Sequence, residues 1–141
     1  MGGQRQYLPG GGFSDYQYRQ VGETIVAGNG VSGKVIARID ETNEGHSGMP
    51  QYSSTSEVYL KISDETHRVE QAGIYKDRRL VYQIDWDHSH GGIEKGVAHV
   101  HTFDWSRKNS RSKKVTMMSD ELISRYGELL KKADPNIKFR P

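Results

Sequence analysis

The sequence predicts one α+β domain in which an antiparallel sheet of about five or six strands is covered by a single C-terminal helix. Three observations lead to this prediction. The chain has 141 residues, a usual length for one domain, and a domain of that size buries roughly two thirds of its unfolded surface. Apolar and polar residues alternate over much of residues 58–105, and a 3.6-residue period follows near the C-terminus.

The first third of the chain has weaker patterns. Residues 1–20 are rich in glycine, glutamine and tyrosine and show neither a helical nor a strand period, so we expect a flexible leader before a domain at 21–141. Short β-favouring runs at 24–26 and 34–39 flank a glycine-rich turn and predict two short strands. Residues 43–56 are polar and contain glycine and proline, which favours a loop.

Strand patterns are clearer further along. Apolar residues alternate with polar ones at 58–62, a weaker candidate follows at 69–75, and residues 80–86 have a regular period of two. A further strand is expected at 97–105, after the pair Gly91-Gly92. These four segments form the main part of the predicted sheet.

One helix is predicted near the C-terminus. Ser119 is a suitable N-cap residue, and Asp134-Pro135 ends the pattern. Between them, five apolar residues share one face of a 3.6-residue period: Leu122, Ile123, Tyr126, Leu129 and Leu130. We expect this face to pack against the apolar side of the strand at 80–86, which consists of Leu80, Ile84 and Trp86.

Four of the six histidines form two His-x-His pairs, at 88–90 and 99–101. In a strand, residues two apart project from the same face, so each pair is expected to point in one direction. Counting back from His88 in steps of two reaches Trp86 and Ile84. The histidines are therefore predicted to continue the apolar face, at the edge of a pocket.

Such a cluster fits two chemistries. Imidazoles with a pKa of about 6.5 can act as general acid and base, as in the cleavage of RNA by attack of its own 2′-hydroxyl. The two pairs can instead supply nitrogen ligands to Zn²⁺ or a similar metal, with Asp85, Asp87 or Asp104 as an additional partner. A third interpretation needs no function, because histidines beside a Gly-Gly turn can be polar residues tolerated at a sheet edge.

A basic run follows the second histidine pair. Five cations and no acidic residue fall within residues 107–114, although the whole chain carries a net charge of only +2. This run is either a phosphate-binding surface or a solvated loop. Trp86, Phe103 and Trp105 can stack on bases, but aromatic residues in strands more often belong to the core. His46 and His67 are expected to be surface residues.

The absence of cysteine excludes disulfides and thiolate metal ligands and favours a reducing compartment. The N-terminal residues lack the apolar run of a signal peptide, and no stretch approaches the ~20 apolar residues that a membrane span needs. We therefore expect a cytoplasmic protein without a membrane partner.

The chain resembles a group of small phage and prophage proteins over about its last ninety residues. The resemblance lies in Gln83-Ile84-Asp85, the two His-x-His pairs, the C-terminal helix and the segment Asn136-Ile137-Lys138-Phe139-Arg140. Similar modules occur at the ends of phage head-morphogenesis proteins and of bacterial polymorphic toxins, and Met1-Gly2-Gly3 resembles the starts of small proteins encoded near phage head genes. The resemblance implies a metal-independent ribonuclease of the barnase, colicin and RelE type, although the helix here follows the sheet and does not precede it.

The leading hypothesis is a phage-encoded or toxin-like ribonuclease that acts on RNA in the host bacterial cytoplasm and needs no metal and no other cofactor. Its predicted catalytic residues are the clustered histidines: His88, His90, His99 and His101. Its predicted nucleic-acid-binding residues are the basic run: Arg107, Lys108, Arg111, Lys113 and Lys114. The alternatives are a non-enzymatic, anti-CRISPR-like phage inhibitor that binds a host nucleoprotein complex, and a zinc-binding module. The oligomeric state is left open.

Overall fold

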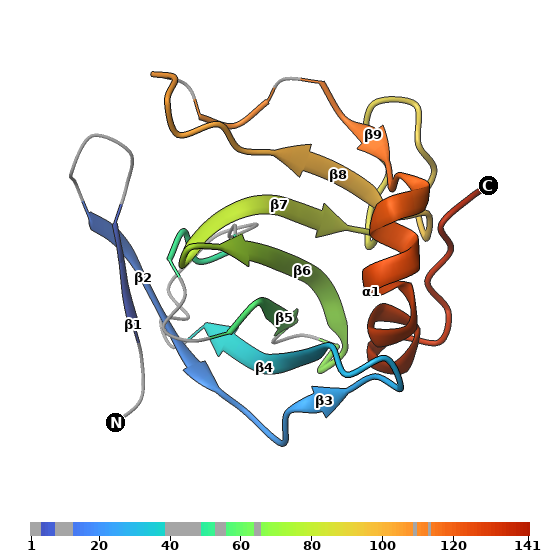
Figure 1. Ribbon diagram of the computed structural model, residues 1–141, viewed down its shortest axis with the longest axis horizontal. Coiled ribbons are helices and arrows are strands. Elements are labelled where there is room, and N and C mark those ends of the chain that lie inside the picture. The colour runs from blue at the N-terminus through green and yellow to red at the C-terminus, as the bar shows by residue number, and fades with distance from the viewer. Residues whose placement is uncertain are drawn as a thin grey trace.

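The computed structural model describes residues 4–7, 13–38, 49–52, 56–63, 66–108, 110–112 and 114–141 (Figure 1). Within these residues the chain is α+β, as predicted, with one helix and a mostly antiparallel sheet. The strands are β1 Gln4–Tyr7, β2 Phe13–Gln20, β3 Ile25–Val26, β4 Ser32–Arg38, β5 Val58–Ile62, β6 Val69–Lys76, β7 Arg79–Asp85, β8 His99–Thr102 and β9 Thr116–Met117. The helix α1 spans Asp120–Ala133.

The strands form one sheet in the order β1-β2-β4-β5-β6-β7-β8-β9, and β3 pairs with β4 beside this path. Neighbouring strands are antiparallel except for β4 and β5, which are parallel. The path described has eight strands, so the predicted number of five or six is wrong. The strands that the sequence did not predict are β1, β2 and the two-residue β9.

Strands β1 and β2 lie within residues 1–20, for which the sequence predicts a leader without strands. That prediction is wrong for both segments. β2 pairs with β4 from Tyr18, opposite Arg38, to Gln20, opposite Ile36. Strand pairing uses backbone hydrogen bonds and does not require alternating apolar and polar side chains. A prediction based on side-chain periodicity therefore misses such strands.

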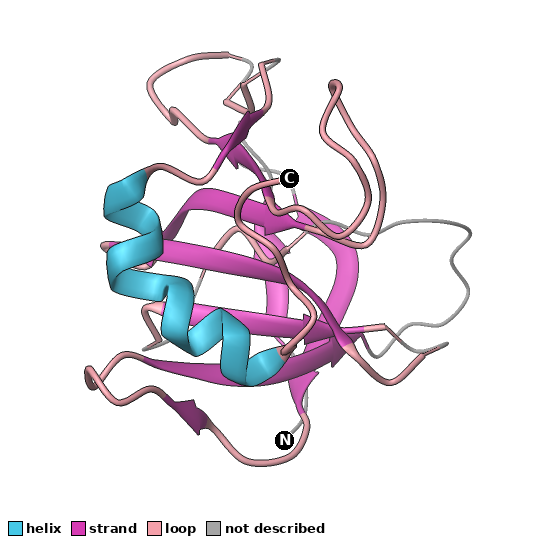
Figure 2. Cartoon of the chain, turned by 90° about the vertical axis from the view of Figure 1, so that its right-hand side faces the viewer, coloured by secondary structure: helices cyan, strands magenta, loops and turns pink. Residues whose placement is uncertain are grey.

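Helix α1 begins and ends where the sequence predicts. The Ser119 hydroxyl caps it by accepting a hydrogen bond from the backbone N–H of Leu122 at 3.2 Å. Two acidic residues in the first turn and two lysines in the last turn complement the helix dipole. The helix lies across one face of the sheet (Figure 2).

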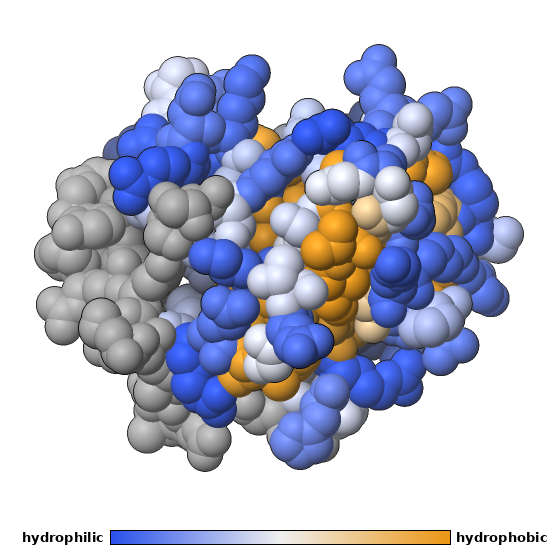
Figure 3. Space-filling model, turned by 60° about the horizontal axis from the view of Figure 1, so that its bottom comes forward, coloured by the Kyte–Doolittle hydropathy of each residue, from blue (hydrophilic) through white to orange (hydrophobic). Residues whose placement is uncertain are grey.

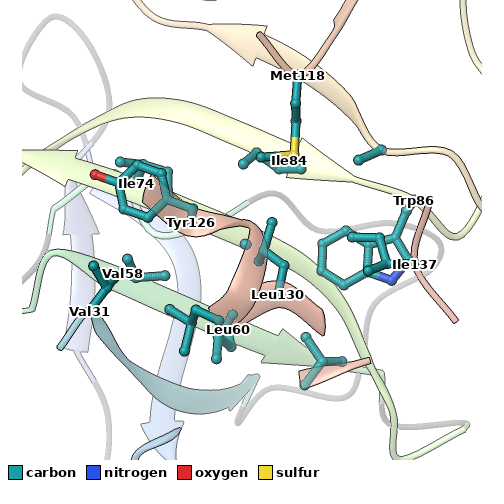
Figure 4. Close-up of a cluster of buried hydrophobic side chains, with 14 of the residues drawn as sticks. Val31, Val58, Leu60, Ile74, Ile84, Trp86, Met118, Tyr126, Leu130 and Ile137 are labelled. Atoms are coloured by element: carbon teal, nitrogen blue, oxygen red, sulfur yellow. The ribbon is translucent and has the colours of Figure 1, made fainter. Parts of the chain in front are cut away.

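Within the described residues, buried side chains form one cluster on each face of the sheet. The cluster beneath α1, the helix-side core, includes Val58, Leu60, Ile74, Ile84, Trp86, Val100, Tyr126, Leu129 and Leu130 (Figure 4). The cluster on the other face, the second core, consists of Tyr18, Ile36, Met49, Tyr59, Tyr75 and Leu80. Adjacent residues of a strand point to opposite faces, and this accounts for the separation of Leu60 from Tyr59.

The predicted contact between the strand at 80–86 and the helix is confirmed for Ile84 and Trp86 but is wrong for Leu80. Ile74 of β6 pairs with Tyr82, whereas the next residue of β6, Tyr75, pairs with Leu80. Val81 is therefore an extra residue in β7, which forms a β-bulge. The bulge turns Leu80 toward the second core.

The described surface is mostly polar on the face drawn in Figure 3, with one strip of hydrophobic side chains. Among the described residues, Val26 and Met117 are the large hydrophobic residues that are exposed. No helix in the described part of the chain combines the length and the apolar character needed to cross a bilayer.

Candidate metal and substrate site

The second histidine pair lies on the face of the sheet that carries the second core. Asp85 of β7 lies opposite His99 of β8. The next pair on the same face is Gln83 and His101. Ile84, between Gln83 and Asp85, points to the helix-side core. The prediction that the histidines continue the apolar face is therefore wrong. Side chains alternate between the two faces only within the strand, and β7 ends at Asp85.

A tight turn folds the first histidine pair back over the sheet. His90 and Ile93 exchange two backbone hydrogen bonds of 2.9 Å each. The two residues between them, Gly91 and Gly92, have φ angles of 58° and 84°. Both angles lie in the left-handed region, which glycine adopts at little cost and which two-residue hairpin turns require. The Gly-Gly sequence thus explains how His90 reaches β8.

The four imidazoles converge, as the sequence predicts. The ring of His99 is central, with its centroid 5.0 Å from that of His88, 5.5 Å from that of His90 and 5.6 Å from that of His101. The rings of His90 and His101 lie 5.3 Å apart, and those of His88 and His90 lie 6.2 Å apart. Two strands and one turn therefore gather all four predicted histidines into one cluster.

A row of buried polar residues crosses four strands and ends at this cluster. Lys61, Gln71, Asp85 and His99 are successive cross-strand partners on β5, β6, β7 and β8. Their exposed fractions are 5%, 2%, 2% and 0%. The Lys61 ammonium donates a hydrogen bond to the Gln71 carboxamide oxygen at 2.9 Å. Such a row inside a sheet requires that each polar group find a partner.

The carboxylate of Asp85 is held in its ionised form. Burial raises the pKa of Asp85, but hydrogen bonds with His101, Gln71 and Gln83 hold this pKa below its usual value. The Gln83 amide lies 3.2 Å and 3.3 Å from the two carboxylate oxygens. Asp85 is therefore an oriented anion next to the imidazoles.

His99 is fully buried and lacks hydrogen-bond partners. Neither of its ring nitrogens is hydrogen-bonded within the described part of the chain. Its Nε2 lies 3.7 Å from the Asp85 carboxylate, beyond hydrogen-bond distance. Burial lowers the pKa of His99 to about 4, against the raising effect of Asp85, and the other three histidines lower it further. His99 is thus a neutral imidazole whose two polar atoms are buried at a cost in free energy.

His101 is positioned by a cation from the basic run. The guanidinium of Arg111 lies 3.0 Å from His101 Nε2, and the Asp85 carboxylate lies 3.5 Å from the same nitrogen. A guanidinium can only donate, so Nε2 accepts from Arg111 when the ring proton is on Nδ1, whereas the other tautomer donates from Nε2 to Asp85. That Nδ1 has no partner among the described residues. Arg111 therefore connects the histidine cluster to the basic run.

His88 lies beside Asp87, which in turn interacts with Glu70. His88 Nδ1 lies 2.7 Å from Asp87 Oδ1, a contact that orients the imidazole. Glu70 lies next to Asp87, and its pKa is raised to about 7 by burial first and by the charge and hydrogen bonding of Asp87 second. Glu70 therefore keeps its proton to a higher pH than an ordinary glutamate does.

Three of these side chains could hold a metal ion together. Ligand atoms of Asp85, His88 and His99 all lie within 4.8 Å of one another. One carboxylate and two imidazoles are donors that Zn²⁺ and similar ions accept, and His90 and His101 adjoin them. The carboxylate contact of His88 is typical of a histidine that binds a metal through its other nitrogen.

A cavity of about 420 Å³ opens beside the cluster. Its described lining includes five polar site residues: Asp85, His88, His90, His101 and Arg111. The rest of that lining consists of three glutamines and three apolar residues: Gln51, Gln71, Gln83, Met49, Leu80 and Phe103. His99 is absent from the lining, so it lies behind the cavity wall and not at its surface.

The basic run lines a second hollow, of about 680 Å³. Arg107, Lys108, Arg111 and Lys114 contribute to its wall, and Arg111 lines both this hollow and the cavity. All four side chains are exposed. Lys113, also predicted to bind nucleic acid, lies outside the described residues. The structure therefore brings four of the five predicted cations to one hollow next to the histidines.

The other residues singled out in the sequence have different surroundings. Trp86 is a core residue, and its indole N–H donates to the Asp134 carboxylate at 3.0 Å. Phe103 and Trp105 are half-buried and stack with their centroids 5.9 Å apart. His67 is exposed in the turn before β6, and His46 lies outside the described residues.

Sequence reasoning missed the glutamines and Glu70. Gln71 and Gln83 both follow the strand period and stand where a buried face would call for apolar residues. A long polar side chain at such a position is the signal that could have pointed to them. Gln51 has no comparable signal, because it lies in a segment without periodicity.

Comparison of the chain with known protein families, with curated proteins and with solved structures finds no match. The resemblance to phage and toxin modules therefore stays a prediction.

Proposed function

We propose that the protein is a metal-dependent ribonuclease, with a divalent ion bound by Asp85, His88 and His99. The observation that carries this proposal is the buried imidazole of His99, which has no hydrogen-bond partner for either nitrogen within the described residues and which faces the Asp85 carboxylate. A metal ion bound by one of these nitrogens would satisfy a polar atom that is otherwise buried without a partner.

The surroundings of the three ligands support this proposal. Gln83 donates to the Asp85 carboxylate, and the Asp87 carboxylate contacts His88, so two of the three ligands have partners that fix their orientation. When bound, a divalent ion supplies Lewis-acid stabilisation of a phosphoryl oxygen.

Burial argues against the simpler scheme in which all four histidines act directly on the substrate. His99 is 0% exposed and His101 is 3% exposed, and a general acid or base must come within hydrogen-bond reach of the reacting group. His90 is exposed and lines the cavity, so it is the best-placed histidine for proton transfer. His101 is instead held in contact with Arg111.

The position of the cations supports RNA as the substrate. Arg111 lies where the cavity meets the hollow lined by Arg107, Lys108 and Lys114, so a polyanion could run from the histidines along the basic run. RNA also carries its own nucleophile, the 2′-hydroxyl, which His90 could deprotonate beside a phosphate held by Arg111.

The proposal is tested by metal content and RNA cleavage of the full chain. We expect one Zn²⁺ or Mn²⁺ per chain by calorimetry and elemental analysis, and loss of cleavage in EDTA that is reversed by the same metal. Asp85→Asn, which keeps the shape of the side chain, and His99→Asn should abolish both metal binding and cleavage. His67→Asn, at an exposed histidine in the turn before β6, is the matched control and should behave like the wild type.

Two outcomes would overturn the proposal. Cleavage that persists in EDTA would instead support metal-free acid–base catalysis by the histidines. A chain that binds neither metal and cleaves no RNA would leave the non-enzymatic inhibitor as the remaining hypothesis.

A further inference from the structure

We infer that the side chains of Gln51, Met49, Leu80 and Phe103, which contribute to the lining of the cavity, form a subsite for one unpaired nucleobase. This inference rests on the proposed ribonuclease function and narrows its substrate to single-stranded RNA. The described lining combines two kinds of side chain: histidines with Asp85 and Arg111, and apolar side chains with glutamine amides.

Phe103 offers an aromatic surface that is held in place by its neighbour Trp105. Its ring stacks on Trp105 at an interplanar angle of 18°. The indole N–H of Trp105 donates to the backbone carbonyl of Leu80 at 2.7 Å, and the guanidinium of Arg79 lies 4.9 Å from the Trp105 ring centroid. Arg79 is held in turn by a 3.0 Å hydrogen bond to the Tyr52 hydroxyl. Trp105 packs against the Phe103 ring and Arg79 packs on Trp105, so the aromatic side chain that lines the cavity is held in place and offers a surface on which a planar base can stack.

The three glutamines of the cavity differ in whether their amides are already engaged. The Gln83 oxygen accepts from the backbone N–H of Met49 at 3.4 Å, and its nitrogen donates to Asp85. The Gln71 oxygen accepts from Lys61. The Gln51 side-chain oxygen is buried and has no hydrogen-bond partner among the described residues.

An unpaired buried oxygen indicates the chemistry of the missing ligand. An N–H or O–H donor would satisfy it, and the edge of every nucleobase carries an N–H donor as an amino or a ring N–H group. Met49 and Leu80, which are 5% and 1% exposed, provide the apolar contacts that a base plane needs beside such a donor.

The geometry also determines the form of the nucleic acid. A base at Phe103 and Gln51 shares the cavity with Arg111, which can hold the adjoining phosphate, and the strand can continue along the basic hollow. A base in a duplex is paired and stacked, so its edge and faces are not available to such a cavity. The substrate base must therefore be unpaired.

The inference is tested by oligonucleotide binding to the full-length, metal-free chain, in EDTA, so that cleavage plays no part. The probe is a short 2′-O-methyl RNA, compared with the same strand carrying one abasic residue and with its duplex. The intact single strand should bind about 5- to 100-fold more tightly than the abasic strand, which is the contribution expected from one stacked base. The duplex should bind no better than the abasic strand.

Two substitutions test the named residues. Gln51→Leu and Phe103→Leu should each weaken binding of the intact strand toward that of the abasic strand and leave binding of the abasic strand unchanged. Phe139→Leu, at a partly buried phenyl group packed against the helix-side core, and Gln20→Leu, at an exposed glutamine, are the matched controls. If Phe103→Leu fails to fold by circular dichroism, Gln51→Leu alone decides the result, because it removes no core side chain.

Equal affinity for intact, abasic and duplex probes, or no binding of the intact strand, would overturn the inference. Metal-dependent cleavage by the same preparation would then leave the proposed function in place. Conversely, base-dependent binding by a chain that binds no metal and cleaves no RNA would support the base subsite and refute the ribonuclease proposal.

Discussion

The pKa values of His99 and of Glu70, two residues of the candidate site, are shifted in opposite directions. Burial lowers the pKa of His99 to about 4, and burial together with Asp87 raises the pKa of Glu70 to about 7. On acidification the unfolded chain protonates its histidine first, so the contribution of His99 to stability is present above pH 6.5 and is lost as the pH falls toward 4. The contribution of Glu70 is present below pH 4.5 and is lost as the pH rises through 7.

These opposite signs give a prediction for pH dependence. Between pH 6.5 and pH 4.5 the two contributions largely cancel, so Glu70→Gln should expose the loss caused by His99. We expect the free energy of unfolding of the Glu70→Gln variant, measured with urea on metal-free protein, to fall on acidification more steeply than that of the wild type. The double variant Glu70→Gln/His99→Asn should restore the flat profile. A Glu70→Gln profile parallel to that of the wild type would show that the two groups do not compensate.

At the scale of secondary-structure elements, the helix and the central strands followed from periodicity, while local interruptions did not. The period of two across residues 80–86 predicts one face for Leu80, Ile84 and Trp86, yet the bulge at Val81 moves Leu80 to the other face. Pairing with β6 produces that bulge, and the sequence of β7 alone has no signal for it.

For the candidate site too, some features could be predicted from the sequence and others could not. Clustering of the four histidines could be predicted from the two His-x-His pairs, although the first pair lies after the end of β7 and reaches β8 through the Gly91-Gly92 turn. The face could not be predicted, because nothing in the sequence marks the end of β7 at Asp85. The free amide of Gln51 depends on contacts between residues far apart in the chain and has no local pattern at all.

Packing of α1 on the sheet gives a prediction for stability. Leu129 is 0% exposed in the helix-side core, and removal of a buried leucine side chain costs about 2 to 5 kcal/mol. Leu129→Ala should therefore lower the thermal midpoint by several degrees or more, as measured by circular dichroism. Ser124→Ala, at an exposed position of the same helix, should change the free energy of unfolding by less than about 0.5 kcal/mol. Equal midpoints for the two variants would contradict the docking of this face.

At the scale of the whole molecule, the two faces of the sheet differ in composition and role. The face beneath α1 is apolar and supplies the larger core. The other face carries the row from Lys61 to His99 and the cavity beside it. The polar groups are thus separated from the helix-side core by the thickness of the sheet, so we expect substitutions in the cavity to leave the packing of α1 unchanged.

The parallel pairing of β4 with β5 has a consequence for the order of folding. Strands β5 to β8 are joined in sequence by antiparallel pairs, whereas β4 and β5 are separated by residues 39–57. A contact between distant segments first costs the entropy of closing the loop between them, and the favourable interactions form only afterwards. Such contacts therefore form late. In pulse-labelled hydrogen exchange during refolding, amides of β6 and β7 should become protected before those of β4, and the reverse order would contradict this. The strands nearest the N-terminus, which a ribosome makes first, would then be the last to join the sheet.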